Sequence, residues 1–169
     1  MPLVLGSVLM NVAFRRNLIL AVVLSIQAPL AAQDYKPKLD TALEKIRNFL
    51  AEKKPDWKHK SVEPIQGSHN VSVNNWEFEG RIVRVSIVAY GSEDDAMAAM
   101  RRFAAQERTL DRLPDICDGG YSWGMGGSNI AFRKGDLTVW VSNSVTNLGQ
   151  GVELTKEFAT LIGAGWCGN

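Results

Sequence analysis

The chain is poor in the side chains on which most hydrolytic and metal chemistry depends. Histidine occurs only twice in 169 residues, as His59 and His69. A serine nucleophile normally needs a histidine base within reach, so a site of that kind would have to use one of these two. The usual histidine and cysteine spacings of zinc sites are also missing. We therefore assign no catalytic residue from these patterns and predict neither a metal nor a cofactor.

Neither sign of charge predominates. The formal net charge of the chain is +1, which is too small to attract nucleic acid or an anionic membrane over a distance. One local exception is the lysine segment 53–60, in which four lysines surround Trp57. This segment could bind a polyanion such as a lipid headgroup or an acidic glycan. The alternative, which we favour, is a solvated turn whose lysines complement the C-terminal dipole of the preceding helix.

A long hydrophobic run is missing as well. The apolar core Leu18–Ile26 has nine residues, whereas a membrane-spanning helix needs about 20. It follows two arginines and precedes small residues up to Ala32, a pattern typical of a cleaved secretory signal peptide. We predict a signal peptide over 1–32 and a single periplasmic or secreted domain over 33–169, with no stable membrane insertion after cleavage. An uncleaved anchor is the alternative, because residues 1–14 are also uncharged.

Cysteine is limited to Cys117 and Cys167. No Cys-x-x-Cys motif is present and no histidine lies near either residue, so a redox pair or a metal site is disfavoured. In an oxidising compartment two cysteines indicate one disulfide. Closing a loop of about 50 residues would stabilise the fold by roughly 4 kcal/mol on the chain-entropy model. The bond would attach the C-terminal tail to the loop after the middle helix.

Hydrophobic periodicity predicts three helices. Apolar residues spaced three and four apart indicate a helix over 36–53, which Pro55 ends. Ser92, followed by three acidic residues, caps a second helix that must end before Pro114. A last helix carries an apolar stripe through Ile162 and is expected to stop at Gly163.

Alternation of apolar and polar residues predicts two hairpins between these helices. The expected strands are 71–78 with 81–90, and 129–133 with 137–142. The apolar residues change parity at Asn74-Asn75, which predicts a β-bulge there.

The resulting order of helix, hairpin, helix, hairpin, helix predicts an α+β fold. We expect a single twisted antiparallel sheet of four to six strands with about three helices packed against it. Strand-strand-helix occurs over 71–108 and again over 129–163, which would make a ββα pseudo-repeat.

Three acidic or basic groups remain as candidates for catalysis. Glu77 and Glu79 are two apart on an expected strand beside Trp76 and Phe78, and paired carboxylates near an aromatic floor are what glycosidases use. A solvated sheet face explains the same pattern more simply. His69 could act as a lone acid–base group, or it could be an exposed turn residue.

The glycine-rich segment 119–127 is the most suggestive feature of the chain. It is not a phosphate-binding loop, because no Gly-Lys-Ser/Thr follows and the next element is an expected strand. Tyr121 and Trp123 on this backbone could form a contact surface for a sugar, peptide or protein; the alternative is an edge strand and a long turn with both rings packed on the core. Trp140 falls on the polar side of its strand, where it is either covered by a helix or available to a partner together with Trp123.

The run Gly-Tyr-Ser-Trp at 120–123, followed by Ile-Ala-Phe-Arg-Lys-Gly-Asp-Leu-Thr-Val-Trp-Val-Ser at 130–142, resembles a segment of small secreted bacterial α+β domains. That group includes exported proteins of unknown function, lipoproteins and extracytoplasmic sensor domains of receptor kinases. The resemblance implies a sheet-and-helix domain and no enzymatic residues. No cysteine lies directly after the apolar core Leu18–Ile26, so a lipid anchor is not expected here.

Two functions from different classes are consistent with these patterns. The first is an exported non-catalytic domain that contacts a protein, peptide or glycan of the cell envelope through Tyr121, Trp123 and Trp140. The second is an envelope hydrolase, acting on a glycan or an ester, that uses Glu77 with Glu79, or His69.

Overall fold

The computed structural model describes residues 34–64, 68–107 and 110–168. The expected signal peptide, residues 1–32, lies outside the described residues. In the part of the chain that is described, no helix is both long and apolar enough to cross a membrane.

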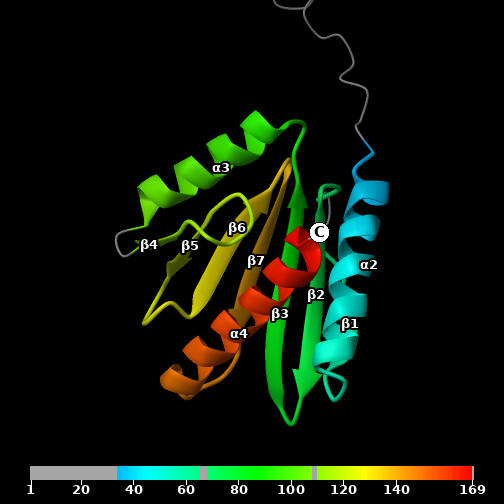
Figure 1. Ribbon diagram of the computed structural model, residues 1–169, viewed down its shortest axis with the longest axis vertical. Helices are drawn as coiled ribbons and strands as arrows, with labels where there is room; N and C mark the ends of the chain where they lie inside the picture. Colours follow the sequence, from blue (N-terminus) through cyan, green and yellow to red (C-terminus); the bar gives the residue numbers. More distant parts are fainter. Residues whose placement is uncertain (1–33, 65–67, 108–109, 169) are drawn as a thin grey trace, which may run out of the picture. The chain divides into compact units, whose positions relative to one another are not determined.

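The fold is α+β, as the alternating pattern predicted (Figure 1). Within the described residues one antiparallel sheet has seven strands in the order β1-β2-β3-β7-β6-β5-β4, so the prediction of four to six strands was too low. The helices are α2 (Lys36–Lys53), α3 (Glu93–Gln106) and α4 (Leu148–Cys167). The strands are β1 (Lys58–Val62), β2 (Val71–Phe78), β3 (Arg81–Ala89), β4 (Leu110–Leu113), β5 (Gly120–Trp123), β6 (Asn129–Lys134) and β7 (Leu137–Asn143).

The additional strands are the short outer ones. β1 has five residues and β4 and β5 have four each. Segments of this length hold too few alternations to be recognised by periodicity, and β1 is also rich in lysine. They form because the central hairpins offer a free edge to pair with on each side.

The main core lies between the sheet and the helices α2 and α4. Figure 1 shows α4 crossing the sheet with α2 beside it, and both helices contact β3. Every second residue of the central strands points to this side, and the strand residues that are fully buried here include Val83, Val85, Ile87 and Val139. Phe158 and Ile162 of α4 are buried against them.

The predicted β-bulge in β2 is wrong. β2 pairs with β3 continuously from Val71↔Val88 to Phe78↔Arg81, without a skipped residue. The apolar pattern changes parity because Asn74 occupies a buried position on the helix side, where an apolar residue was expected. Its Oδ1 lies 3.0 Å from His59 Nε2 and its Nδ2 donates to Ser72 Oγ at 3.0 Å. These partners offset the cost of burying an amide.

Helix α3 lies on the opposite side of the sheet from α4. Phe132 of β6 contacts Trp166 of α4, and Phe132 pairs with Val139. Phe103 of α3 instead contacts Trp140, the neighbour of Val139 on β7, and neighbouring residues of a strand point to opposite faces. The two strand-strand-helix units therefore place their helices on different faces, and they do not form the expected repeat in space.

Helix α4 continues to Cys167 instead of stopping at Gly163. Glycine occurs in it where the helix approaches its neighbours most closely. A Cβ on Gly163 would lie 3.0 Å from Ile116 Cγ1, and a Cβ on Gly165 would lie 2.3 Å from Phe49 Cγ of α2. These glycines thus serve packing and not helix termination.

Replacing Gly165 by alanine should separate α2 from α4. We expect G165A to lower the free energy of unfolding by about 1–3 kcal/mol, as overpacking typically does. Gly149→Ala is the matched control, because its Cβ would meet only Asn147 Oδ1 at 3.7 Å. Alanine favours a helix by up to about 1 kcal/mol over glycine, so G149A should be neutral or stabilising. Urea unfolding of both variants measures the difference, and equal stabilities would contradict the close helix contact.

Candidate functional site

The glycine-rich segment forms the short strand β5 and the turns on either side of it. Gly124, Gly126 and Gly127 have positive φ angles, which glycine adopts without strain. Gly120 has no room for a side chain, since a Cβ there would lie 2.5 Å from the Ala131 carbonyl oxygen. The alternation of the strand sends Tyr121 to the α3 side of the sheet and Ser122 to the α4 side. Each side is hollowed by its own groove.

Trp123 and Trp140 are engaged within the fold by α3. The ring of Phe103 lies 4.5 Å from Trp123 and 4.8 Å from Trp140, and the two tryptophans are 5.4 Å apart, all in edge-to-face contact. Trp140 Nε1 donates to Thr138 Oγ1 at 2.9 Å. Of the two alternatives for Trp140, a covering helix is therefore the one that the structure contains. Both tryptophans are half-buried.

Tyr121 lies in a groove of about 350 Å³ between α3 and the β4–β5 edge. We call it the arginine groove, because Arg101 of α3, Arg112 of β4 and Arg133 of β6 line it with the half-buried Tyr121. Arg133 is neutralised by Glu93 at 2.7 Å and Asp118 at 3.4 Å. Among the described residues, Arg101 and Arg112 have no carboxylate partner. The groove therefore carries uncompensated positive charge beside an aromatic ring.

A larger groove of about 870 Å³ lies on the other side of the same edge. We call it the α4 groove, because small residues of α4 form one wall and the chain after β4 forms the other. Ser122 and Ile130 line it from the sheet, and both are buried. Arg112 and Pro114 line both grooves. The remaining lining residues include Leu113, Asp115, Ile116, Lys156, Ala159, Thr160 and Gly163.

Ser122 lies in a sequence motif that our search for a serine nucleophile with a histidine base did not recognise. Residues 120–124 read Gly-Tyr-Ser-Trp-Gly, which matches the Gly-x-Ser-x-Gly pattern of hydrolase nucleophiles. That pattern requires a turn from a strand into a helix, whereas Ser122 lies within β5 and the chain turns into another strand. His59 belongs to β1 at the far edge of the sheet. Lys156 lines the same groove but is exposed and pairs with Glu153 at 3.7 Å.

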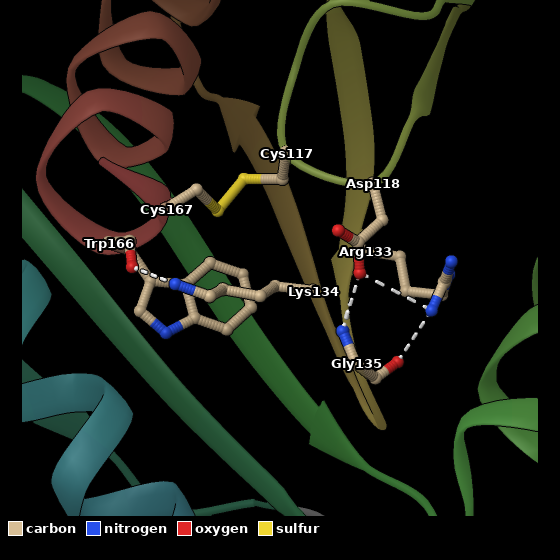
Figure 2. Close-up of a disulfide and its surroundings, with 7 residues drawn as sticks. All are labelled: Cys117, Asp118, Arg133, Lys134, Gly135, Trp166 and Cys167. Atoms are coloured by element: carbon tan, nitrogen blue, oxygen red, sulfur yellow. Dashed lines mark hydrogen bonds and ion pairs between the residues drawn. A yellow bond between two sulfur atoms is a disulfide. The ribbon is translucent and has the colours of Figure 1, made fainter. Parts of the chain in front are cut away.

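A disulfide holds one end of the α4 groove. Figure 2 shows Cys117 bonded to Cys167, with Cα atoms 5.4 Å apart, so the structure places the two cysteines as the cysteine count predicted. Cys117 has a positive φ of 52°, a strained conformation that its surroundings must hold. Next to it, Asp118 accepts a hydrogen bond from the Gly135 amide at 2.7 Å, and Lys134 Nζ donates to the Trp166 carbonyl at 2.9 Å. The β4–β5 connection is thus attached both to α4 and to the β6–β7 turn.

The other predicted groups do not come together as a catalytic site. Glu79 lies in the β2–β3 turn and pairs with Arg81 at 3.4 Å, while Glu77 is on β2, so the two do not share a strand face. His69 is exposed and lines a separate groove of about 360 Å³ with Ser61 and Ser72. No hydrogen bond joins it to either hydroxyl among the described residues.

The lysine segment 53–60 is divided between structural roles. Lys54 forms an ion pair with Glu157 of α4, and Lys58 belongs to the edge strand β1. Trp57 packs on Phe158 with ring centres 4.8 Å apart, so the ring of Trp57 is packed against the core. The ring of Trp57 is half-buried and serves packing in this segment.

No protein family model, curated protein or solved structure matches this chain. In the described part of the chain, no three histidine, cysteine, aspartate or glutamate side chains are grouped so that they could hold a metal ion. Functional inference therefore depends on the two grooves.

Removing the disulfide should destabilise the fold strongly. The bond closes a separation of 50 residues, so Cys117→Ala combined with Cys167→Ala should cost about 3–4 kcal/mol of unfolding free energy. Urea unfolding measures the loss, with reduced wild-type protein as the control that keeps both side chains. A loss below about 1 kcal/mol would show that the neighbouring hydrogen bonds hold this edge without the crosslink.

The aromatic residues of β5 should differ in their effect on stability. Trp123→Ala removes a ring from the cluster with Phe103 and should cost about 2–3 kcal/mol. Tyr121→Ala should cost about 1 kcal/mol or less, because Tyr121 faces an open groove. Thermal unfolding of the two variants tests this order, and a reversed order would contradict the packing described for α3.

Proposed function

We propose that this protein is an exported, non-catalytic binding domain that contacts a partner of the cell envelope, a protein, peptide or glycan, through Tyr121 in the arginine groove. Trp123 and Trp140 lie on the same face of the sheet as Tyr121 and attach that face to α3 through Phe103. In this proposal the glycine-rich segment serves to position an aromatic contact residue and not to carry a nucleophile.

The observation that carries the proposal is the unpaired charge around Tyr121. A guanidinium group binds a carboxylate or phosphate through two parallel hydrogen bonds, and Arg101 and Arg112 have no such partner among the described residues. Tyr121 adds an apolar ring with a polar tip, which suits a half-exposed contact surface. The partner that these groups favour is acidic.

Binding is better supported than catalysis. Ser122 has no base in hydrogen-bond contact within the described residues, and Glu77 and Glu79 are not paired on one face. The disulfide supports the proposed export, because such bonds persist in oxidising compartments.

Reversing the charge of the arginine groove should weaken the binding of acidic oligomers. We expect purified wild-type protein to bind hexaglutamate or trigalacturonate in titration calorimetry at low ionic strength. The affinity of R101E/R112E for either probe should be at least about tenfold lower. The matched control is K58E/K60E, which changes the net charge equally at the opposite edge of the sheet and should keep its affinity within about threefold.

Each alternative result would overturn the proposal in its own way. Equal losses in both double variants would indicate a response to net charge alone. A loss confined to K58E/K60E would move the binding site to the lysine segment. Failure of both probes to bind wild-type protein would reject an acidic partner for this groove. Circular dichroism of each variant confirms that it is folded.

A further inference from the structure

The edge strand β4 lies between the two grooves, and this position identifies the form of the ligand. We infer that the partner is an extended acidic peptide segment that pairs with β4 as an eighth strand, placing acidic side chains in the arginine groove and apolar side chains in the α4 groove. This inference rests on the proposed function and extends it by naming the ligand class and the way it binds.

The first support is the free edge of β4. β4 is the last strand in the sheet order and pairs only with β5 among the described residues. In an antiparallel ladder every second residue directs its backbone N–H and C=O groups away from the neighbouring strand. Asp111 and Arg112 in the middle of β4 are exposed. An extended peptide can satisfy such an edge with main-chain hydrogen bonds, which is how strand addition gains affinity.

The second support is the place of the grooves on either side of this edge. Arg112 and Leu113 are consecutive and therefore direct their side chains to opposite faces. Leu113 lines only the α4 groove, whereas Arg112 lines the arginine groove and also the rim that the two grooves share. A strand added at about 4.8 Å from β4 would alternate in the same way. Its successive side chains would then enter the two grooves in turn.

The chemistry of the grooves determines which side chains fit. Arg101 and Arg112 favour carboxylates on the α3 side. On the α4 side the interior is formed by Ile116, Ile130 and Ala159. A volume of about 870 Å³ accepts an aliphatic side chain. Strict alternation of acidic and apolar residues is thus the pattern that suits both faces.

The probe is the peptide acetyl-Val-Glu-Val-Glu-Val-Glu-amide. We expect wild-type protein to bind this peptide in titration calorimetry, and the affinity of R101E/R112E for it should be at least about tenfold lower. Replacing its valines by serine should weaken binding by a similar factor, because the α4 groove would lose its apolar contact. Unchanged affinity of the serine peptide would overturn the assignment of the α4 groove.

Backbone methylation of the peptide tests strand addition itself. One variant carries N-methyl groups on its valines and another on its glutamates. Since the N–H groups of a strand alternate between its two edges, only one of the two variants should lose affinity, by about tenfold or more. Equal affinities, or equal losses in both variants, would overturn the pairing with β4. These peptides leave the protein unchanged, so a folding defect cannot imitate the result.

Amide hydrogen exchange gives an independent readout on the protein. In the presence of the parent peptide, the exchange rate of the outward amides of β4 should fall at least about tenfold. The exchange rates of the amides of β1 should not change. If hexaglutamate and the parent peptide bind, but neither methylation nor exchange distinguishes β4, strand addition fails and the proposed function stands. If neither probe binds, the proposed function fails as well.

Discussion

The apolar contact between the central strands β3 and β7 and the helices α2 and α4 is the interaction on which the rest of the structure depends. The side chains that β3 and β7 direct toward these helices, such as Val83, Val85 and Val139, have no exposed surface, and burial of this kind is the main favourable contribution to folding. At β4 the core is less completely covered, since Leu113 packs against it but is only half-buried. Grooves can therefore exist at this edge without weakening the centre.

The edge that carries the grooves is held by means other than a large core. The Cys117–Cys167 bond attaches it to the end of α4, and Asp118 attaches it to the amide of Gly135. On the opposite face Phe103 packs on two tryptophans. These attachments keep the backbone of β5 in place while Tyr121 lines the arginine groove and Ser122 lines the α4 groove. A binding site needs this combination of a rigid support and unoccupied surface.

Local signals in the sequence were reliable where one residue type has one structural use. Ser92 accepts a hydrogen bond from the Asp95 amide as an N-cap, and Glu79-Gly80 forms the expected turn with two positive φ angles. The prediction failed where a residue is placed by a distant neighbour. Gly163 was expected to end a helix, but it lies inside α4 and faces Ile116. Asn74 led to the prediction of a bulge that is not there, because one of its hydrogen-bond partners, His59, lies on a different strand.

For the candidate site, the sequence by itself determined that Tyr121, Trp123 and the cysteines are unusual, because aromatic residues on a glycine-rich backbone and a single cysteine pair can be recognised locally. Only the tertiary structure decided what they do. Arg101, Arg112 and Tyr121 belong to three different elements, and α3 covers Trp140 from outside its own hairpin. A groove arises from the surfaces of several elements, and no periodicity within one segment records which surfaces will meet. The physical reason is that alternation specifies two faces for each strand, whereas packing between elements decides which of them stays open.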